Sequence, residues 1–212
     1  MRMLKIACGR SRNALNWSNR TISWEDLCER LRTTFRTRET VAQYKAMTRA
    51  ERDDAKDKGG FVGGHLRGGR RRVKDVECRS LLSLDADHAE PGFIDRFEQE
   101  CGVAAAIYTT HGHTPEAPRV RIVIPFEEDI TPDCYAAVAR YYAARWGIDQ
   151  FDECSYKVNQ LMHWPTTPAD GEYICRIIDG PAFDPMSFLS AYPDWQDCSK
   201  LPVSSREKQV RV

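Results

Sequence analysis

The stretch Ser80–His88, "SLLSLDADH", predicts a β-strand that ends in two aspartates one residue apart. Because side chains alternate across a strand, Leu82 and Leu84 are expected to face a core. Asp85 and Asp87 then share the opposite face, about 7 Å apart. Two carboxylates at such a short distance raise each other's pKa unless a cation neutralises them. Paired oxygen ligands suit Mg²⁺ or Mn²⁺. The stretch predicts a metal-binding strand end, with two solvated aspartates as the simpler alternative, because short patterns recur by accident.

The elements that follow this strand indicate an α+β fold. Capping signals and apolar periodicity predict strand 79–87, helix 91–101, strand 103–111, strand 119–126, helix 131–147 and strand 159–165. This β-α-β-β-α-β order is the ferredoxin-like pattern of RNA-recognition folds and several polymerase palms. The run 172–178, "EYICRII", is expected to add an edge hairpin. We predict one domain over residues 1–212, with an N-terminal module (1–78), an RNA-recognition-like core (79–180) and a tail or linker (181–212).

Residues 1–78 are expected to form a helical module that is rich in glycine and arginine. Two pairs, Ser23 with Asp26 and Thr48 with Glu51, have the spacing of helix capping boxes. The run 56–72, "KDKGGFVGGHLRGGRRR", contains three glycine pairs, which permit unusual backbone angles and close approach to a ligand. A flexible basic surface loop is the alternative interpretation of this run. The arginines predicted to bind nucleic acid are Arg67, Arg70, Arg71 and Arg72.

Polar side chains recur on the second and third predicted strands of the core. By alternation, Thr109 and His111 share one face, and Arg119 and Arg121 share a face of the next strand. A hairpin would bring the four beside the aspartate pair. Together they describe a site for a triphosphate, whose oxygens need cations and fork-shaped donors. Taken singly, His111 is more often a structural hydrogen bonder, and the two arginines could simply solvate a strand.

A third carboxylate is predicted in the run 150–160, "QFDECSYKVNQ", just before the last strand of the core. In the predicted topology that strand lies beside the first, so Asp152 would join Asp85 and Asp87. Three carboxylates would complete a two-metal site for phosphoryl transfer. The spacing leaves Asp149 and Glu153 as rivals of Asp152.

The amino-acid composition excludes some classes of protein but does not identify the function. Lys and Arg together number 31, as do Asp and Glu, so the total charge does not indicate a nucleic-acid binder. The eight cysteines stand singly without a C-x-x-C pair, which indicates a reduced compartment and no zinc knuckle. The sequence shows neither a signal peptide nor a membrane-length apolar run. A cytoplasmic protein without a membrane partner is therefore expected.

Three runs resemble, in order and spacing, the motifs of archaeo-eukaryotic-type primases: "SLDAD" (83–87), "YTTHGHTPEAPRVRIVIP" (108–125) and "FDECSYKVNQLMHWP" (151–165). These primases carry a D-x-D, an S-x-H and a later acidic residue. The three runs look specific to primase-polymerase domains of phage and mobile-element replication proteins, and resemble particularly the amino-terminal part of virulence-associated E-like proteins. It departs from the family pattern at Thr109, where a serine is expected, and at His163, where a tyrosine is expected.

The resemblance implies the archaeo-eukaryotic primase fold and a template-dependent nucleotidyltransferase, a DNA primase or DNA polymerase acting on single-stranded DNA. It implies two Mg²⁺ or Mn²⁺ ions, a primer strand and a deoxynucleoside or ribonucleoside triphosphate, with a helicase domain or protein as a further partner. The metal ligands implied are Asp85, Asp87 and Asp152. The nucleotide contacts implied are Thr109, His111 and Arg121, with Arg119 and His113 in second rank.

Two other classes of protein remain open at this stage. His111 and His113 resemble the histidine pair of rolling-circle (HUH) nucleases, which use the same fold and a helix-borne tyrosine nucleophile. The candidate nucleophiles are Tyr135, Tyr141 and Tyr142. The other alternative is a non-catalytic module that binds single-stranded nucleic acid by stacking bases on aromatic residues of the sheet. The predicted acidic surface argues against it, because acids repel a phosphate backbone unless a metal intervenes.

Overall fold

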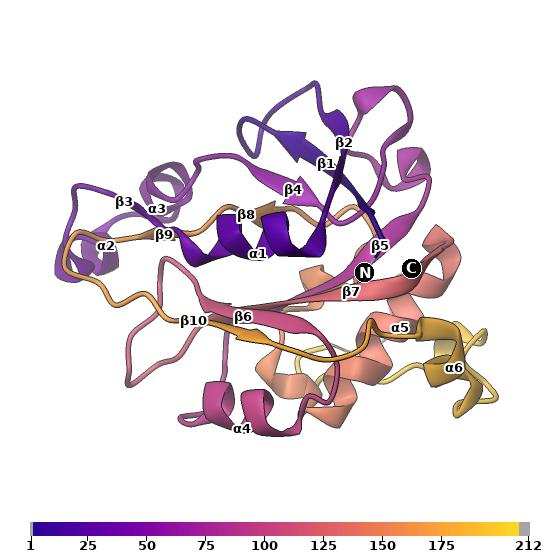
Figure 1. Cartoon of the computed structure of the whole chain (residues 1–212). Helices are drawn as coiled ribbons and strands as arrows, with labels where there is room; N and C mark the ends of the chain where they lie inside the picture. Colours follow the sequence, from indigo (N-terminus) through magenta and orange to yellow (C-terminus); the bar gives the residue numbers. More distant parts are fainter. Residues whose placement is uncertain (1, 208–212) are drawn as a thin grey trace.

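The structure is a computed structural model that describes residues 2–207 (Figure 1). The strands are β1 (Leu4–Gly9), β2 (Ser18–Ile22), β3 (Phe35–Arg36), β4 (Gly60–Val62), β5 (Arg79–Ala86), β6 (Ala105–Thr109), β7 (Val120–Ile130), β8 (Met162–His163), β9 (Thr166–Thr167) and β10 (Cys175–Ile178). The α-helices are α1 (Trp24–Arg32), α2 (Val41–Ala46), α3 (Arg49–Ala55), α4 (Phe93–Glu100), α5 (Pro132–Arg145) and α6 (Pro185–Ser190).

A central antiparallel sheet has the strand order β10-β6-β7-β5. Five of the six predicted elements of the core are confirmed, as β5, α4, β6, β7 and α5. Leu82 and Leu84 of β5 and Ile122 of β7 belong to the main hydrophobic cluster, together with side chains of α4 and α5. The alternation read from the sequence is thus correct for β5, and it sets Asp85 on the face away from these helices.

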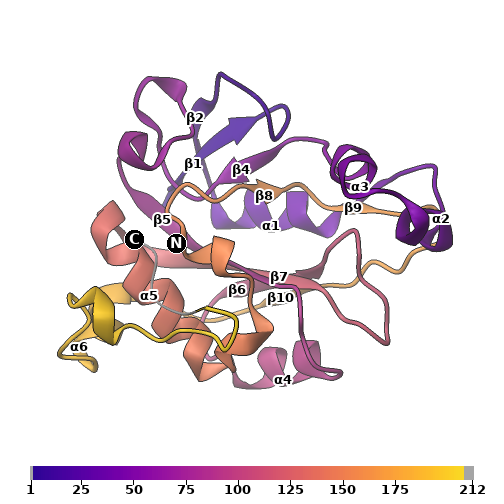
Figure 2. The ribbon, with the colours of Figure 1, turned by 180° about the vertical axis from the view of Figure 1, so that it is seen from behind.

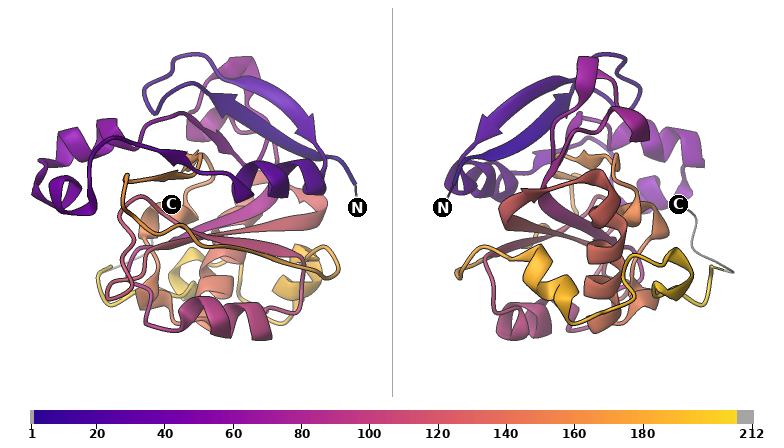
Figure 3. Two further views of the ribbon diagram at one scale, coloured as in Figure 1. Left: turned by 60° about the vertical axis from the view of Figure 1, so that its left-hand side comes forward. Right: turned by 90° about the vertical axis from the view of Figure 1, so that its right-hand side faces the viewer.

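The opposite face of the central sheet is covered by the N-terminal part of the chain (Figure 3). Helix α1 packs there, with Leu27 and Leu31 in a second buried cluster beside Tyr108 and Val123 of the central sheet. Ser23 caps α1, and the capping box predicted at Thr48 begins α3. The N-terminal module also contains strands that the sequence analysis did not foresee. Three of them join β8 in a second sheet, in the order β2-β1-β4-β8, and β3 pairs with β9.

The last predicted strand of the core is displaced from its expected place. Within 159–165 only Met162–His163 forms a strand, β8, and it pairs with β4 of the second sheet rather than with β5. The chain before it turns through the short 3₁₀ helix Glu153–Tyr156 at the end of β5, and then crosses to the second sheet. The predicted edge element at 172–178 is present as β10, which pairs with β6.

The glycine-rich run 56–72 is built into the fold rather than forming a loose loop. Its residues Gly60–Val62 are β4, fully buried between β1 and β8. A side chain at Gly60 would collide with the carbonyl oxygen of Met162 on β8. Gly60 therefore permits the close pairing of β4 with β8. The sequence pattern alone does not distinguish this role of a glycine from close approach of a ligand to the backbone.

A tail or linker is expected over residues 181–212. Residues 181–207 pack along α5 (Figure 2), and residues 208–212 lie outside the described residues. Leu189 of α6 and Leu201 lie in the main hydrophobic cluster. All eight cysteines are free thiols. Across residues 2–207, no helix has the length and apolar character needed to cross a membrane.

Candidate active site

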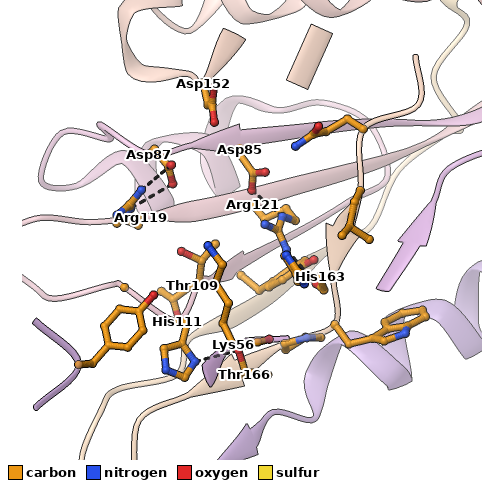
Figure 4. A pocket seen from close by; sticks show the side chains of 18 of the residues that line it. Lys56, Asp85, Asp87, Thr109, His111, Arg119, Arg121, Asp152, His163 and Thr166 are labelled. Atoms are coloured by element: carbon orange, nitrogen blue, oxygen red, sulfur yellow. Dashed lines mark hydrogen bonds and ion pairs between the residues drawn. The ribbon is translucent and has the colours of Figure 1, made fainter. Parts of the chain in front are cut away.

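A cavity of about 310 Å³ lies between the central sheet and the N-terminal part of the chain (Figure 4). It brings together most of the site residues predicted from the sequence. These are Asp85, Asp87, Asp152, Thr109, His111, Arg119, Arg121 and Arg71. They come from three strands, three loops and the glycine-rich run, so their meeting depends on the tertiary fold.

The centre of the cavity is a buried ion pair between neighbouring strands. Asp85 of β5 lies opposite Arg121 of β7, and Arg121 Nε donates to Asp85 Oδ1 at 2.5 Å. Burial raises the pKa of Asp85, against the effect of Arg121, which favours the charged carboxylate. Burial also disfavours the charge on Arg121, but Asp85 and Tyr108 together raise the pKa of the guanidinium above its ordinary value. A second nitrogen of Arg121 donates to the carbonyl of His163 at 2.8 Å, so the fold holds the guanidinium in place.

A more exposed pair lies beside it at the cavity rim. Arg119 Nε donates to Asp87 Oδ1 at 3.0 Å, and a second guanidinium nitrogen contacts Oδ2. Burial works against the charge of Arg119, but the Asp87 carboxylate raises its pKa overall. Each of the two sequence-predicted aspartates therefore has an arginine partner.

Asp152 reaches the site from the loop after α5. Its backbone N–H donates to the carbonyl of Asp85 at 2.8 Å, which fixes the loop to the end of β5. Its Oδ1 accepts from the Cys154 N–H at 2.9 Å. In Figure 4 the carboxylate points toward the part of the cavity that holds Asp85 and Asp87. Of the two rivals, neither Asp149 nor Glu153 lines this cavity.

His111 is held by hydrogen bonds at both ring nitrogens. Nε2 lies 2.9 Å from Glu39 Oε1, and Nδ1 lies 2.8 Å from Thr166 Oγ1. Burial lowers the pKa of His111, which favours the neutral ring with its proton on Nε2, toward Glu39. The ring also packs against Tyr44, with 4.5 Å between ring centroids. In this structure His111 thus joins the central sheet to α2 and β9.

The strand face that carries Asp85 and Arg121 presents Tyr108, not Thr109. Tyr108 is in register with Arg121, whereas Thr109 is in register with Val120 of the helix-covered core. The Thr109 hydroxyl accepts from the Ile174 N–H at 3.0 Å. Strand alternation predicted that Thr109 and His111 share one face. This prediction is wrong, because β6 ends at Thr109 and His111 lies in the turn that follows.

His113 does not join the other predicted site residues. It lines a separate hollow of about 190 Å³ beside α4, and its Nε2 is buried without a hydrogen-bond partner within residues 2–207. The turn after β6 carries it away from the cavity, since His113 N–H bonds back to the Thr110 carbonyl.

The four arginines of the glycine-rich run separate into two groups. Arg71 is partly buried, donates to the carbonyls of Arg12 and Asn159, and lines the cavity. It also lines a second hollow of about 510 Å³, together with Arg70 and Arg72. Arg67 lies outside both hollows, with its guanidinium 3.8 Å from Glu77.

Three cavity residues from distant segments were not assigned from the sequence as parts of this site. Tyr44 belongs to α2, and Lys56 ends α3, where it pairs with Asp53 at 2.9 Å. The third is His163 of β8. Burial and, to a smaller extent, the positive charge of Arg121 lower the pKa of His163 to about 4. Only the departure from the family pattern pointed to His163. Nothing in the local sequence of Tyr44 or Lys56 indicates that the N-terminal helices cover the sheet.

The donor chemistry of the cavity fits hard divalent cations. Asp85 and Asp152 each use only Oδ1 in hydrogen bonds within residues 2–207, so each has an oxygen to offer to a cation. A cation at Asp87 would have to replace the pairing with Arg119. As the side chains stand, no three His, Cys, Asp or Glu groups in the described part of the chain form a ready-made metal cluster.

Comparisons with known proteins agree with the resemblance seen in the sequence. The profile of the VapE N-terminal domain matches residues 1–204. The chain is similar in fold to the AEP domain of the primase-polymerase (PrimPol) of cyanophage S-2L, with a TM-score of 0.50 and 16% sequence identity. That match covers 80% of this chain and 96% of the phage domain. No curated protein sequence matches significantly. The predicted fold class is thereby confirmed.

Proposed function

The chain belongs to the VapE N-terminal domain family, and from this premise and the cavity we propose that it is a template-dependent nucleotidyltransferase of the primase-polymerase type. The single observation that carries the proposal is the meeting of three carboxylates and four cations in one cavity. The carboxylates are Asp85, Asp87 and Asp152, and the cations are Lys56, Arg71, Arg119 and Arg121. A nucleoside triphosphate with divalent cations matches this mixture of charges.

The proposed reaction joins the 3′-hydroxyl oxygen of a growing strand to the α-phosphorus of the triphosphate. The bond from that phosphorus to the β-phosphate oxygen breaks, pyrophosphate leaves and the hydroxyl proton passes to solvent. Mg²⁺ or Mn²⁺ would supply activation of the hydroxyl and stabilisation of charge on the phosphates. Asp85, Asp87 and Asp152 would hold the two ions from β5 and the neighbouring loop.

The cations of the cavity have separate tasks in this proposal. Arg119 and Lys56, which both line the cavity, would contact phosphate oxygens. Arg121 is fixed by Asp85 and by the His163 carbonyl, so it would offer a preorganised charge near the reacting phosphate. Arg71 would contact the template backbone where the two hollows meet, with Arg70 and Arg72 beside it.

The geometry favours this reaction over the nuclease. His113 lies in another hollow than His111, so the two histidines do not share a site. Tyr135 is fully buried and bonded to backbone carbonyls, and Tyr142 is also buried in the core. Tyr141 stacks on Tyr192, away from the cavity. No candidate nucleophile thus meets the histidine pair.

The passive binding module is also disfavoured. It needs an open sheet surface with exposed aromatic residues. Here the corresponding face is covered by α1 and the second sheet, and Tyr108 on it is fully buried.

The test is nucleotide incorporation on single-stranded DNA, with and without a primer, in Mg²⁺ or Mn²⁺. Wild type is compared with Asp152→Asn, which keeps the side-chain shape, and with Asp95→Asn, an exposed control on α4. The proposal expects metal-dependent products from the wild type and the control only. An inactive wild type, or strand cleavage with covalent attachment to a tyrosine, would overturn it.

A further inference from the structure

The segment Ser204–Glu207 lies against the loop that carries Asp152 into the cavity. The Ser205 N–H donates to Asp149 Oδ1 at 2.6 Å. One nitrogen of Arg206 donates to the carbonyls of Asp149, at 2.7 Å, and Phe151, at 2.9 Å. Arg206 therefore bonds the residue directly before Asp152 from outside the central sheet.

A buried ion pair fixes this segment to α5. Arg140 pairs with both carboxylate oxygens of Glu207, at 2.7 and 3.0 Å, and both side chains are only 3% exposed. Arg140 also donates to the Pro202 carbonyl at 2.9 Å, and its guanidinium lies over the ring of Tyr156. Removing either partner of this buried bidentate pair would leave the other charge buried without a countercharge, which would destabilise the protein. The pair therefore anchors the segment.

The same loop is held on its other side by β5. The Asp152 N–H donates to the Asp85 carbonyl at 2.8 Å, and the Asp85 N–H donates to Ser155 Oγ at 2.8 Å. The loop thus lies between two supports, the catalytic strand and the C-terminal segment. Because Asp152 directly follows the carbonyl that Arg206 holds, the position of its carboxylate depends on both supports.

A hollow of about 320 Å³ joins these groups on the side facing solvent. It is lined by Asp87 and Asp152 from the site and by Ser204 and Arg206 from the C-terminal segment. Arg206 therefore reaches the region of the carboxylates, although its hydrogen bonds go to backbone carbonyls.

We propose that Arg206 is a positioning residue that clamps the loop Asp149–Phe151 and thereby sets Asp152 for cation binding. The hydrogen bonds of Arg206 to the carbonyls of Asp149 and Phe151 form the clamp, whereas its consequence for cation binding rests on the proposed function. Loss of the clamp leaves the bonds to β5 and the hydrophobic core untouched, so the fold should survive while the loop loosens.

The experiment compares the full chain with Arg206→Ala, Arg206→Lys and Lys200→Ala. Lys200 is exposed in the same C-terminal part, and its side chain pairs with Asp194 at 3.6 Å, so its loss is the matched control. Hydrogen exchange is followed over residues 149–156, and Mn²⁺ is titrated in nucleotide incorporation. Arg206→Ala should speed exchange in this loop about tenfold and raise the Mn²⁺ concentration for half-maximal rate about tenfold. Arg206→Lys should restore part of both, and Lys200→Ala should change neither.

Unchanged exchange in the loop of Arg206→Ala would overturn the clamp. Faster exchange spread evenly over the whole chain would also overturn it, because the residue would then only stabilise the fold. Faster loop exchange with an unchanged Mn²⁺ requirement would overturn the role in positioning Asp152. A wild type without incorporation would overturn the proposed function, and hydrogen exchange would still decide the clamp.

Discussion

Asp85 and Arg121 face each other on neighbouring strands, and the arginine donates to the carboxylate at 2.5 Å inside a cavity of the fold. The pair unites a candidate cation ligand with a candidate phosphate contact. Bound triphosphate and cations would give each side chain a new partner of opposite charge. The pair therefore stabilises the free protein with the same groups that the proposed reaction uses.

The first prediction separates stability from activity at this pair. Asp85→Asn should reduce incorporation more than 100-fold and destabilise the protein by roughly 3 kcal/mol, because it leaves Arg121 buried without its countercharge. The double variant Asp85→Asn/Arg121→Gln should recover much of the stability without recovering activity. Urea denaturation and primer extension measure the two effects. Activity of Asp85→Asn within twofold of wild type would contradict the metal assignment.

The second prediction concerns Arg119, whose pair with Asp87 lies at the cavity rim. Its side chain is 39% exposed, so solvent screens the pair and Arg119→Ala should change the unfolding free energy by less than about 1 kcal/mol. The KM for the nucleotide should rise about tenfold through the lost phosphate contact. Steady-state kinetics measure this, with Arg176→Ala, an exposed arginine on β10, as control. An unchanged KM would remove Arg119 from the nucleotide site.

The core of the fold could be predicted because its signals are local. The alternation of Leu82 and Leu84 and the start of α5 at Pro132 depend on neighbouring residues, and both elements are present as predicted. The N-cap residue Thr131 makes no side-chain capping bond. The place of β8 was not predictable in this way, because a two-residue strand carries little periodic signal. Its partner, β4, lies inside a run that looked like a flexible loop.

The candidate site shows the same division between local and tertiary information. The D-x-D motif predicted Asp85 and Asp87. The place of Asp152 just before the last predicted strand made it a candidate, with Asp149 and Glu153 as rivals, and the family resemblance then implied Asp152. Tyr44 and Lys56 reach the cavity through contacts with residues far away in the sequence, Tyr44 with the ring of His111 and the Lys56 carbonyl with Thr166. A contact of that kind has no periodicity that a single sequence could display.

The third prediction concerns the template and the arginines of the glycine-rich run. Arg71 lines both hollows, whereas Arg67 lies outside them, so Arg71→Ala should weaken single-stranded DNA binding more than Arg67→Ala does. It should also lower the salt dependence of the binding constant by about one unit in the log–log slope. Fluorescence anisotropy at several salt concentrations measures both. Arg71→Met keeps much of the packing against Trp17, and it should bind as weakly as Arg71→Ala if the charge is what matters. Equal losses for Arg67→Ala and Arg71→Ala would contradict the assignment.

The fourth prediction concerns His163, whose pKa in the folded protein is lowered to about 4, first by burial and then by the Arg121 charge. Its ordinary pKa is about 6.5, so the unfolded chain binds a proton between these values while the folded chain does not. The contribution of His163 to stability is therefore complete above pH 6.5 and is lost as the pH falls toward 4. Between pH 6.5 and pH 5 the loss should be about 2 kcal/mol.

Urea denaturation of wild type and His163→Phe at pH 5, 6.5 and 8 measures this contribution. Phenylalanine fills the space and does not titrate, so the stability of the variant should fall less than that of wild type on acidification. Other titrating groups, including Asp85, affect both proteins alike and cancel in the difference. His163 Nδ1 is buried without a hydrogen-bond partner within residues 2–207, and Asp57 Oδ1 lies 3.8 Å away. Equal pH dependence in the two proteins would contradict the lowered pKa of His163, as would be the case if Asp57 moved to accept a hydrogen bond from the protonated ring.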